Sequence, residues 1–237
     1  MRVRAGWKLP ATGLVLALLA GCPLPRHAPP PPVVVQPHVP AAHSGVPFQV
    51  AAADSLLTIL VYRGGTLASA GHNHVIASHA LAGTVYVPAD LARSSFELHL
   101  PVASLTVDEP GLRAAESAAD FPPDISDSAR EGTRHNMLSA ALLDAAEYQE
   151  IVLRALAMTL TAPGEVRAQL QSSVRGELRE FEVTLHYQLQ DGTLTVSGAF
   201  PLRQSTLGLQ PFSALLGALQ VQDEMQIRLR LVAHAAH

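Results

Sequence analysis

Apolar and polar residues alternate along most of the chain from Phe48 onward. The alternation is clearest near the C-terminus, where Met225, Ile227, Leu229 and Leu231 are separated by single polar or charged residues. Because successive side chains of a β-strand point to opposite faces, this period of two predicts strands with one buried face. Such strands are expected over residues 55–63, 83–87, 96–100, 151–161, 167–175, 181–189, 194–200 and 224–231.

A tight hairpin is predicted between two of these strands. Asp191 and Gly192 separate two alternating segments, and both central positions of such a turn need a positive φ. About eight strands with one apolar face each predict an all-β sandwich or a closed antiparallel barrel. Aromatic residues make up 5% of the chain, too few for the aromatic girdles of a membrane barrel. We therefore expect a barrel, if one forms, to be soluble and apolar inside.

The region over 108–147 breaks the period of two and carries helix-type signals instead. A residue whose side chain can accept a hydrogen bond from the next turn favours the start of a helix. We expect a helix over 129–138 capped by Ser126 or Asp127, a second over 140–146 capped by Ser139, and a shorter turn-rich excursion over 205–217. The sequence thus predicts a helical insertion between strands.

The N-terminus follows a different pattern. Arg2, Arg4 and Lys8 precede an apolar run over 11–20, which is too short to span a bilayer but fits the core of a secretory signal. The run ends in Leu-Ala-Gly-Cys at Cys22, the only cysteine, and this string resembles the lipobox of bacterial lipoproteins. The resemblance implies cleavage before Cys22, acylation of its thiol and stable anchoring by several acyl chains. An ordinary cleaved signal with an incidental cysteine is the alternative.

A proline-rich segment follows the predicted cleavage site. Nine of the 18 prolines lie between Pro23 and Pro47, and prolines favour an extended polyproline II conformation that acts as a semi-rigid spacer. Pro23 stands where lipoproteins retained in the inner membrane have aspartate, so the resemblance implies the outer membrane with the protein facing the periplasm. The expected organisation is a signal peptide over 1–21, a stalk over 22–47 and a barrel domain over 48–237.

Composition excludes several classes of chemistry. Lys8 is the only lysine, so the mature chain lacks the ammonium group that Schiff-base, Ser-Lys and P-loop chemistry need. A single cysteine excludes internal disulfides, CxxC redox pairs and cysteine-rich zinc sites. The formal charge is −4, and cleavage of the leader would remove three basic residues. This balance argues against nucleic acid as a partner, because phosphate binding needs clustered basic residues.

Several strings occur in order across the domain. They are Gly-His-Asn-His-Val over 71–75, Pro-Val-Ala-Ser-Leu over 101–105, Arg-His-Asn-Met-Leu over 134–138 with Leu143, Asp144 and Tyr148 behind it, Phe-Pro-Leu-Arg-Gln-Ser-Thr-Leu-Gly-Leu over 200–209, and Val-Gln-Asp-Glu over 221–224. Together they resemble the YceI-like family of polyisoprenoid-binding, lipocalin-like periplasmic barrels. The chain departs from that pattern at Gln149, where the family has proline, and at Ser172, where it has glycine.

The resemblance implies an antiparallel lipocalin-like barrel of about eight strands with a helical insertion. A barrel of that size can hold one elongated ligand, and the family binds isoprenoid-tailed amphiphiles. We therefore expect a lipid-anchored periplasmic barrel that binds or carries such a molecule, is not an enzyme and needs no cofactor. A homodimer is left open. The expected ligand-binding residues are an apolar lining of Leu57, Ile59, Val61, Phe96, Leu98, Phe181, Val183, Val196 and Phe200, with His72, His74 and Arg134 at a polar end.

The histidines permit a different interpretation. His72 and His74 stand two residues apart, so on an extended segment both imidazoles point to one side and could start a metal site that needs a third ligand. His79 follows, but no glutamate stands at the spacing of a cupin motif. A metal-binding protein or metalloenzyme using His72 and His74 is thus the alternative function. A stalked structural or adaptor domain with a filled core is a third.

Overall fold

The computed structural model describes residues 44–236. The predicted signal peptide, the predicted lipidation site Cys22 and most of the predicted stalk lie outside these residues. Among the described residues, no helix is both long and apolar enough to cross a membrane.

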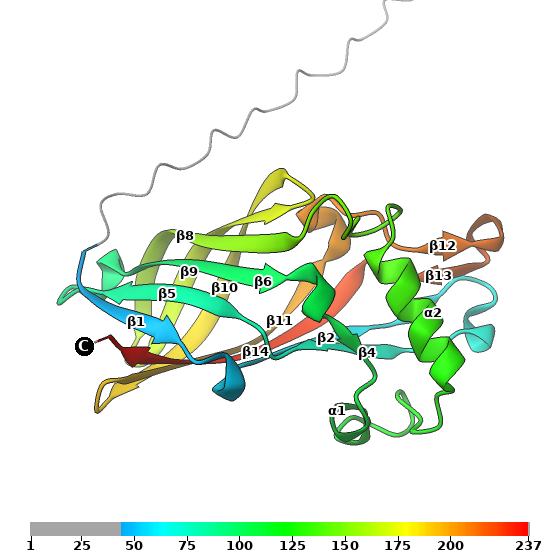
Figure 1. Cartoon of the computed structure of the whole chain (residues 1–237), viewed down its shortest axis with the longest axis horizontal. Helices are drawn as coiled ribbons and strands as arrows, with labels where there is room; N and C mark the ends of the chain where they lie inside the picture. The colour runs from blue at the N-terminus through cyan, green and yellow to red at the C-terminus, as the bar shows by residue number, and fades with distance from the viewer. Residues whose placement is uncertain (1–43, 237) are drawn as a thin grey trace, which may run out of the picture. The chain divides into compact units, whose positions relative to one another are not determined.

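Antiparallel strands dominate the described part of the chain (Figure 1). The main sheet contains β1 (Val46–Val50), β2 (Leu56–Val61), β4 (His74–Ser78), β5 (Ala82–Val87), β6 (Ser95–Pro101), β7 (Thr106–Val107), β8 (Glu150–Ala162), β9 (Glu165–Val174), β10 (Glu177–Gln190), β11 (Thr193–Arg203) and β14 (Glu224–Ala235). A small second sheet contains β12 (Ser213–Ala214), β13 (Leu219–Val221) and β3 (Arg63–Gly64). The helices are α1 (Pro110–Ala114) and α2 (Asp127–Leu138), with short 3-10 turns at η1 (Ala52–Asp54), η2 (Ala68–Ala70), η3 (Leu91–Arg93), η4 (Val102–Ser104), η5 (Gln204–Leu207) and η6 (Leu215–Gly217).

The main sheet closes into an eight-stranded barrel. Its order is β1-β5-β6-β8-β9-β10-β11-β14, and β14 pairs back with β1. The first half of β14 pairs with β2 and its last residues pair with β1. Strands β1 and β2 are therefore two parts of one interrupted strand. The same holds for β4 with β5 and for β6 with β7, because β4 pairs with β2 and β7 while β5 pairs with β1 and β6.

Buried serines satisfy the backbone where the strands are interrupted. Ser55 stands between β1 and β2, donates its hydroxyl to the carbonyl of Ala51 at 2.8 Å and accepts the Val232 N–H at 3.0 Å. At the end of β4, the hydroxyl of Ser78 accepts the Ala80 N–H and lies 2.8 Å from that of Ser104. Buried backbone groups need such partners, so the interruptions are stable features of the barrel.

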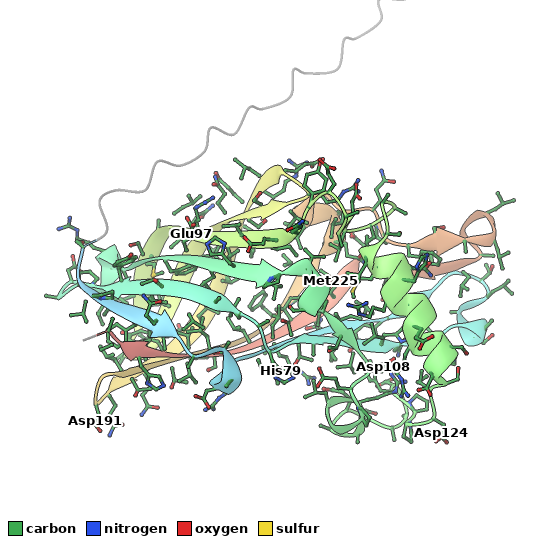
Figure 2. The ribbon with its side chains drawn as sticks, in the orientation of Figure 1. His79, Glu97, Asp108, Asp124, Asp191 and Met225 are labelled. Carbon is green, nitrogen blue, oxygen red and sulfur yellow. The ribbon has the colours of Figure 1, made fainter. Side chains whose placement is uncertain are left out.

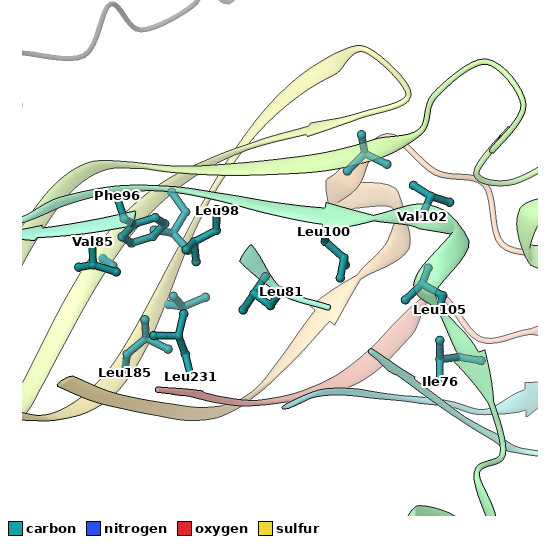
Figure 3. Packing of buried hydrophobic residues seen from close by; sticks show 14 of the residues in the cluster. Ile76, Leu81, Val85, Phe96, Leu98, Leu100, Val102, Leu105, Leu185 and Leu231 are labelled. Atoms are coloured by element: carbon teal, nitrogen blue, oxygen red, sulfur yellow. The ribbon is translucent and has the colours of Figure 1, made fainter. Parts of the chain in front are cut away.

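The predicted alternation is present, and the apolar face of each alternating strand points into the barrel. On β10, Val183 and Leu185 are buried while Glu182, Thr184 and His186 are exposed. The inward side chains of the other strands join them in one core cluster. Figure 3 shows part of this cluster, with side chains from β5 and β6 opposite side chains from β10 and β14.

The predicted hairpin and the first predicted helix are confirmed. Asp191 and Gly192 have φ values of 50° and 71° and join β10 to β11. Helix α2 begins at Asp127, and the Ser126 hydroxyl accepts the Ala129 N–H at 3.2 Å. The excursion over 205–217 is also turn-rich as expected.

The second predicted helix, over 140–146, is wrong. The chain forms turns there, with Asp144 at a φ of 48°. The Leu143 N–H donates to the carbonyl of Met137, which folds the segment back on the end of α2. This path buries the side chain of Leu143 in the core, and that burial outweighs the local preference of an alanine-rich segment for helix.

Candidate functional site

A cavity of about 650 Å³ lies inside the barrel. Its wall is mostly leucine, isoleucine, valine and phenylalanine from the inward faces of the strands. Gly198 on β11 also faces inward, since a Cβ there would lie 2.6 Å from the Leu185 side chain. The interior is therefore a hollow apolar space rather than a filled core.

All the predicted ligand-binding residues except Arg134 line this cavity. They are Leu57, Ile59, Val61, His72, His74, Phe96, Leu98, Phe181, Val183, Val196 and Phe200. The structure thus brings together side chains of β2, β6, β10 and β11 that the period of two had placed on the apolar faces of their strands, and it adds His72 from the segment before β4 and His74 from the first position of β4.

Arg134 lies outside this cavity. It stands on α2 but lines a shallow depression with Glu131 and His135 outside the barrel cavity. Its guanidinium donates to the carbonyls of Ala103 at 2.8 Å and Leu105 at 3.2 Å. These bonds hold the arginine against the backbone at η4.

One end of the cavity is polar. Arg63, His72, Asn136 and Gln220 line it and are also exposed to solvent. They come from β3, the segment before β4, α2 and β13, which lie at the same end of the barrel in Figure 1. The remaining exposed lining residues are mainly apolar, including Leu160 and Leu189 at the opposite end. The cavity therefore offers one end that can hydrogen-bond and a long apolar interior.

A buried polar cluster supports the polar end. The His74 ring lies 2.7 Å from Asp108 through Nδ1, and the other Asp108 oxygen accepts the Val75 N–H at 2.9 Å. Arg113 donates to that same oxygen at 2.7 Å and to the Asn73 carbonyl at 2.9 Å. Figure 2 shows Asp108 at the α2 end of the barrel. The carboxylate is thus surrounded by donors.

The charge of Asp108 fixes the direction of its hydrogen bond with His74. Burial by itself would raise the pKa of Asp108, but hydrogen bonds from His74 and Val75, with the charge of Arg113, hold that pKa below its ordinary value. The carboxylate is ionised at neutral pH and only accepts, so Nδ1 of His74 carries the shared proton. Nε2 of His74 lies 3.2 Å from the Thr133 hydroxyl on α2. The cluster therefore ties α2 to strand β4.

His72 has a different environment. Its ring centre lies 6.1 Å from that of His74, and the two planes meet at 77°. Burial lowers the pKa of His72, and the nearby groups His74, Arg113 and Arg63 lower it further. The exposed imidazole is therefore neutral at neutral pH and can both donate and accept a hydrogen bond at the polar end of the cavity.

The third histidine points elsewhere. His79 is exposed and lies 3.2 Å from Glu109 through Nε2, away from the cavity. Within residues 44–236 no group of three His, Cys, Asp or Glu side chains is placed to hold a metal ion.

Sequence reasoning missed most of the polar partners. Asp108 and Thr133 stand 34 and 59 residues from His74 on β4, and Arg113 stands 40 residues from Asn73 just before it. No local spacing connects them. The sequence offered one signal for Asp108, which is its position. It stands three residues after the family-like string over 101–105, directly behind the short β7.

Comparison with known proteins identifies the fold. No protein-family model matches the chain, and no curated protein matches its sequence. BcnA of Burkholderia cenocepacia is similar in structure, with a TM-score of 0.56 at 18% identity, covering 78% of this chain and 99% of that one. A polyisoprenoid-binding domain from Saccharophagus degradans, implicated in plant cell wall breakdown, gives a TM-score of 0.53 at 12% identity, covering 81% and 99%.

These two similarities confirm the architecture predicted from the sequence. The chain has the lipocalin-like antiparallel barrel with a helical insertion that a polyisoprenoid-binding domain also has. At such identities the likeness concerns the fold, so the ligand has to be argued from the cavity.

Proposed function

We propose that the barrel binds a hydrophobic, isoprenoid-like amphiphile, with its apolar tail in the cavity and its polar group at the end formed by Arg63, His72, Asn136 and Gln220. The observation that carries the proposal is the apolar cavity of about 650 Å³. Ligand sites in proteins typically measure about 300–1,000 Å³ and are mostly apolar with a few convergent polar groups. The fold shared with a polyisoprenoid-binding domain supports the same function.

The apolar lining supplies the affinity in this proposal. A tail that leaves water contributes roughly 25 cal/mol per Å² of apolar surface buried. An apolar cavity of this kind holds water poorly, so an entering tail displaces little bound solvent. The polar end then sets the orientation, because a headgroup placed deep among leucine and valine side chains would lose its hydrogen bonds.

We propose a binding or carrier role rather than catalysis. His74 is oriented by Asp108 and tied to Thr133, and this arrangement holds α2 on the barrel. Partners in this proposal are the small lipid-like ligand and the membrane that supplies it.

The proposal includes anchoring through Cys22 to the outer membrane, facing the periplasm. Its support is the order of basic, apolar and small residues before that cysteine. Cys22→Ala should leave the protein unprocessed or soluble in the periplasm. Fractionation of that variant with the outer membrane after a high-salt wash would show that the anchor lies elsewhere.

Binding is tested by organic extraction of the purified protein followed by mass spectrometry, with uptake of a fluorescent polyprenyl probe as a second measurement. Val183→Phe should fill part of the cavity and weaken uptake, because Val183 lines it. Thr184→Phe is the matched control, since Thr184 faces outward on the same strand. Wild-type protein without a stoichiometric hydrophobic molecule and without probe uptake would refute the proposed function.

A further inference from the structure

Three exposed leucines stand together at one end of the molecule. Leu215 is 67% exposed, Leu216 is fully exposed and Leu67 is 44% exposed. Leu215 and Leu216 form the turn between β12 and β13, and Leu67 precedes η2 in the segment after β3. We call these three residues the leucine tip.

The backbone of the leucine tip is held in an unusual conformation. Leu215 and Leu216 have φ values of 52° and 56°, a region that costs free energy for residues other than glycine and persists only when the surroundings enforce it. The surroundings do so here, because β13 pairs with β3 and the Leu67 N–H donates to the Ala218 carbonyl at 2.7 Å. Gly65 has no room for a Cβ against that carbonyl. The two loops thus form one fixed unit.

The leucine tip adjoins the polar end of the cavity. Ala214, Leu219 and Gln220 flank the leucine turn and line the cavity, as do Gly71 and His72 beyond η2. Figure 1 shows the β12–β13 hairpin at the same end of the barrel as α2. The exposed leucines therefore stand beside the end of the cavity where the proposed ligand carries its polar group.

The segments that carry the leucine tip are free of acidic residues. Segments 63–72 and 211–222 contain one charged residue, Arg63, and no aspartate or glutamate. The acidic residues at this end belong to α2 and the segment before it, where Asp124, Asp127 and Glu131 are exposed (Figure 2). The two loops that carry the leucine tip therefore present no carboxylate of their own to a phosphate-bearing surface.

We propose that the leucine tip inserts into the interfacial region of a phospholipid bilayer, so that the polar end of the cavity faces the membrane while ligand is exchanged. This inference rests on the proposed function for its purpose. Three leucines offer far less than the roughly 800 Å² per partner that a stable protein interface needs, whereas insertion into lipid needs no complementary protein surface. The apolar cavity beside the leucine tip favours lipid, rather than a protein, as the partner that the tip contacts.

The position of the leucine tip can be measured directly. Trp7 is the only tryptophan, so the full chain with Trp7→Phe and Leu216→Trp carries a single indole at the tip. We expect phosphatidylcholine vesicles with brominated acyl chains to quench this indole more than unbrominated vesicles do. Leu189→Trp in the same Trp7→Phe chain is the matched control, because Leu189 is an exposed cavity-lining leucine at the opposite end. Circular dichroism of both variants should match the wild type.

A functional measurement complements the quenching. Leu215→Ser together with Leu216→Ser should slow transfer of a polyprenyl probe from vesicles at least about tenfold, because each leucine withdrawn from water contributes about that factor or more. Equilibrium binding of the probe in detergent should not change, since neither leucine lines the cavity.

Several results would overturn the docking proposal. These are equal quenching at both positions, quenching only in Leu189→Trp, or a blue-shifted indole in Leu216→Trp that bromine does not reach, which would indicate contact with a second copy of the chain. A wild-type protein that carries lipid while the tip is not quenched refutes docking alone. A quenched tip on a protein that binds no lipid refutes the proposed function alone.

Discussion

The substitution Asp108→Asn tests whether the buried cluster holds the polar end of the cavity together. Asparagine keeps the shape of the side chain but removes its charge. One oxygen can still accept from Val75 and Arg113, while the bond to His74, 2.7 Å in the wild type, loses its ionised acceptor. The Arg113 side chain is 2% exposed and its guanidinium stays charged, so the variant buries a cation without its counter-ion.

The expected cost of Asp108→Asn is about 3–5 kcal/mol of unfolding free energy, the usual result of removing one partner from a buried ion pair. For a domain of this size that corresponds to a fall of about 6–20 °C in Tm. Urea denaturation and thermal unfolding followed by circular dichroism measure both quantities. Asp124→Asn is the matched control, because Asp124 is exposed (Figure 2) and should change stability by less than about 0.5 kcal/mol.

The pH dependence adds a second signature. The pKa of Asp108 is lowered in the folded protein, so its stabilisation is present above the unfolded value of about 3.9 and is lost as pH falls through the lower folded value. The stability gap between wild type and Asp108→Asn should therefore narrow below about pH 4. A gap under about 1 kcal/mol at pH 7, or one that widens in acid, would refute the assigned role of the ion pair.

Three further predictions concern the cavity and its surroundings. Gly198→Ala should destabilise the protein by about 1–3 kcal/mol in urea and reduce probe uptake, because the new Cβ displaces the Leu185 side chain into the cavity; unchanged stability and uptake would contradict the inward position of Gly198. His72 should titrate below pH 6.5 in an NMR pH series, because burial lowers its pKa; a midpoint above that value would show a carboxylate partner instead. Ser126→Ala should lower the free energy of unfolding by about 1 kcal/mol, because the Ala129 N–H loses its capping acceptor. Ser128→Ala, at an exposed position two residues further along, should cost less.

Alternation along the chain predicted the parts of the barrel that face water on one side. Strand β10 shows this most clearly, because Glu182 and Thr184 are exposed while Val183 and Leu185 are buried. The lining of the cavity followed from the same pattern. Where both faces are covered, the pattern disappears.

Strand β4 illustrates that limit. All five residues from His74 to Ser78 are buried, since one face lines the cavity and the other packs against the segment around Phe121. No period of two survives there, and no strand was predicted over these residues. The cluster of Asp108, Arg113 and Thr133 could not be predicted either, because its members meet only after the segment over 108–133 has folded across β4.

The pairing of β14 has a consequence for the order of folding. Its partners β11, β1 and β2 all precede it in the chain, and Phe48 of β1 pairs with Ala235 at the far end of β14. Until β14 docks, three strand edges lack their neighbour and the apolar faces that will line the cavity remain in contact with water. Such contacts between distant parts of a chain form late and leave intermediates prone to aggregate. The cavity is therefore complete only once β14 has joined its partners and closed the barrel.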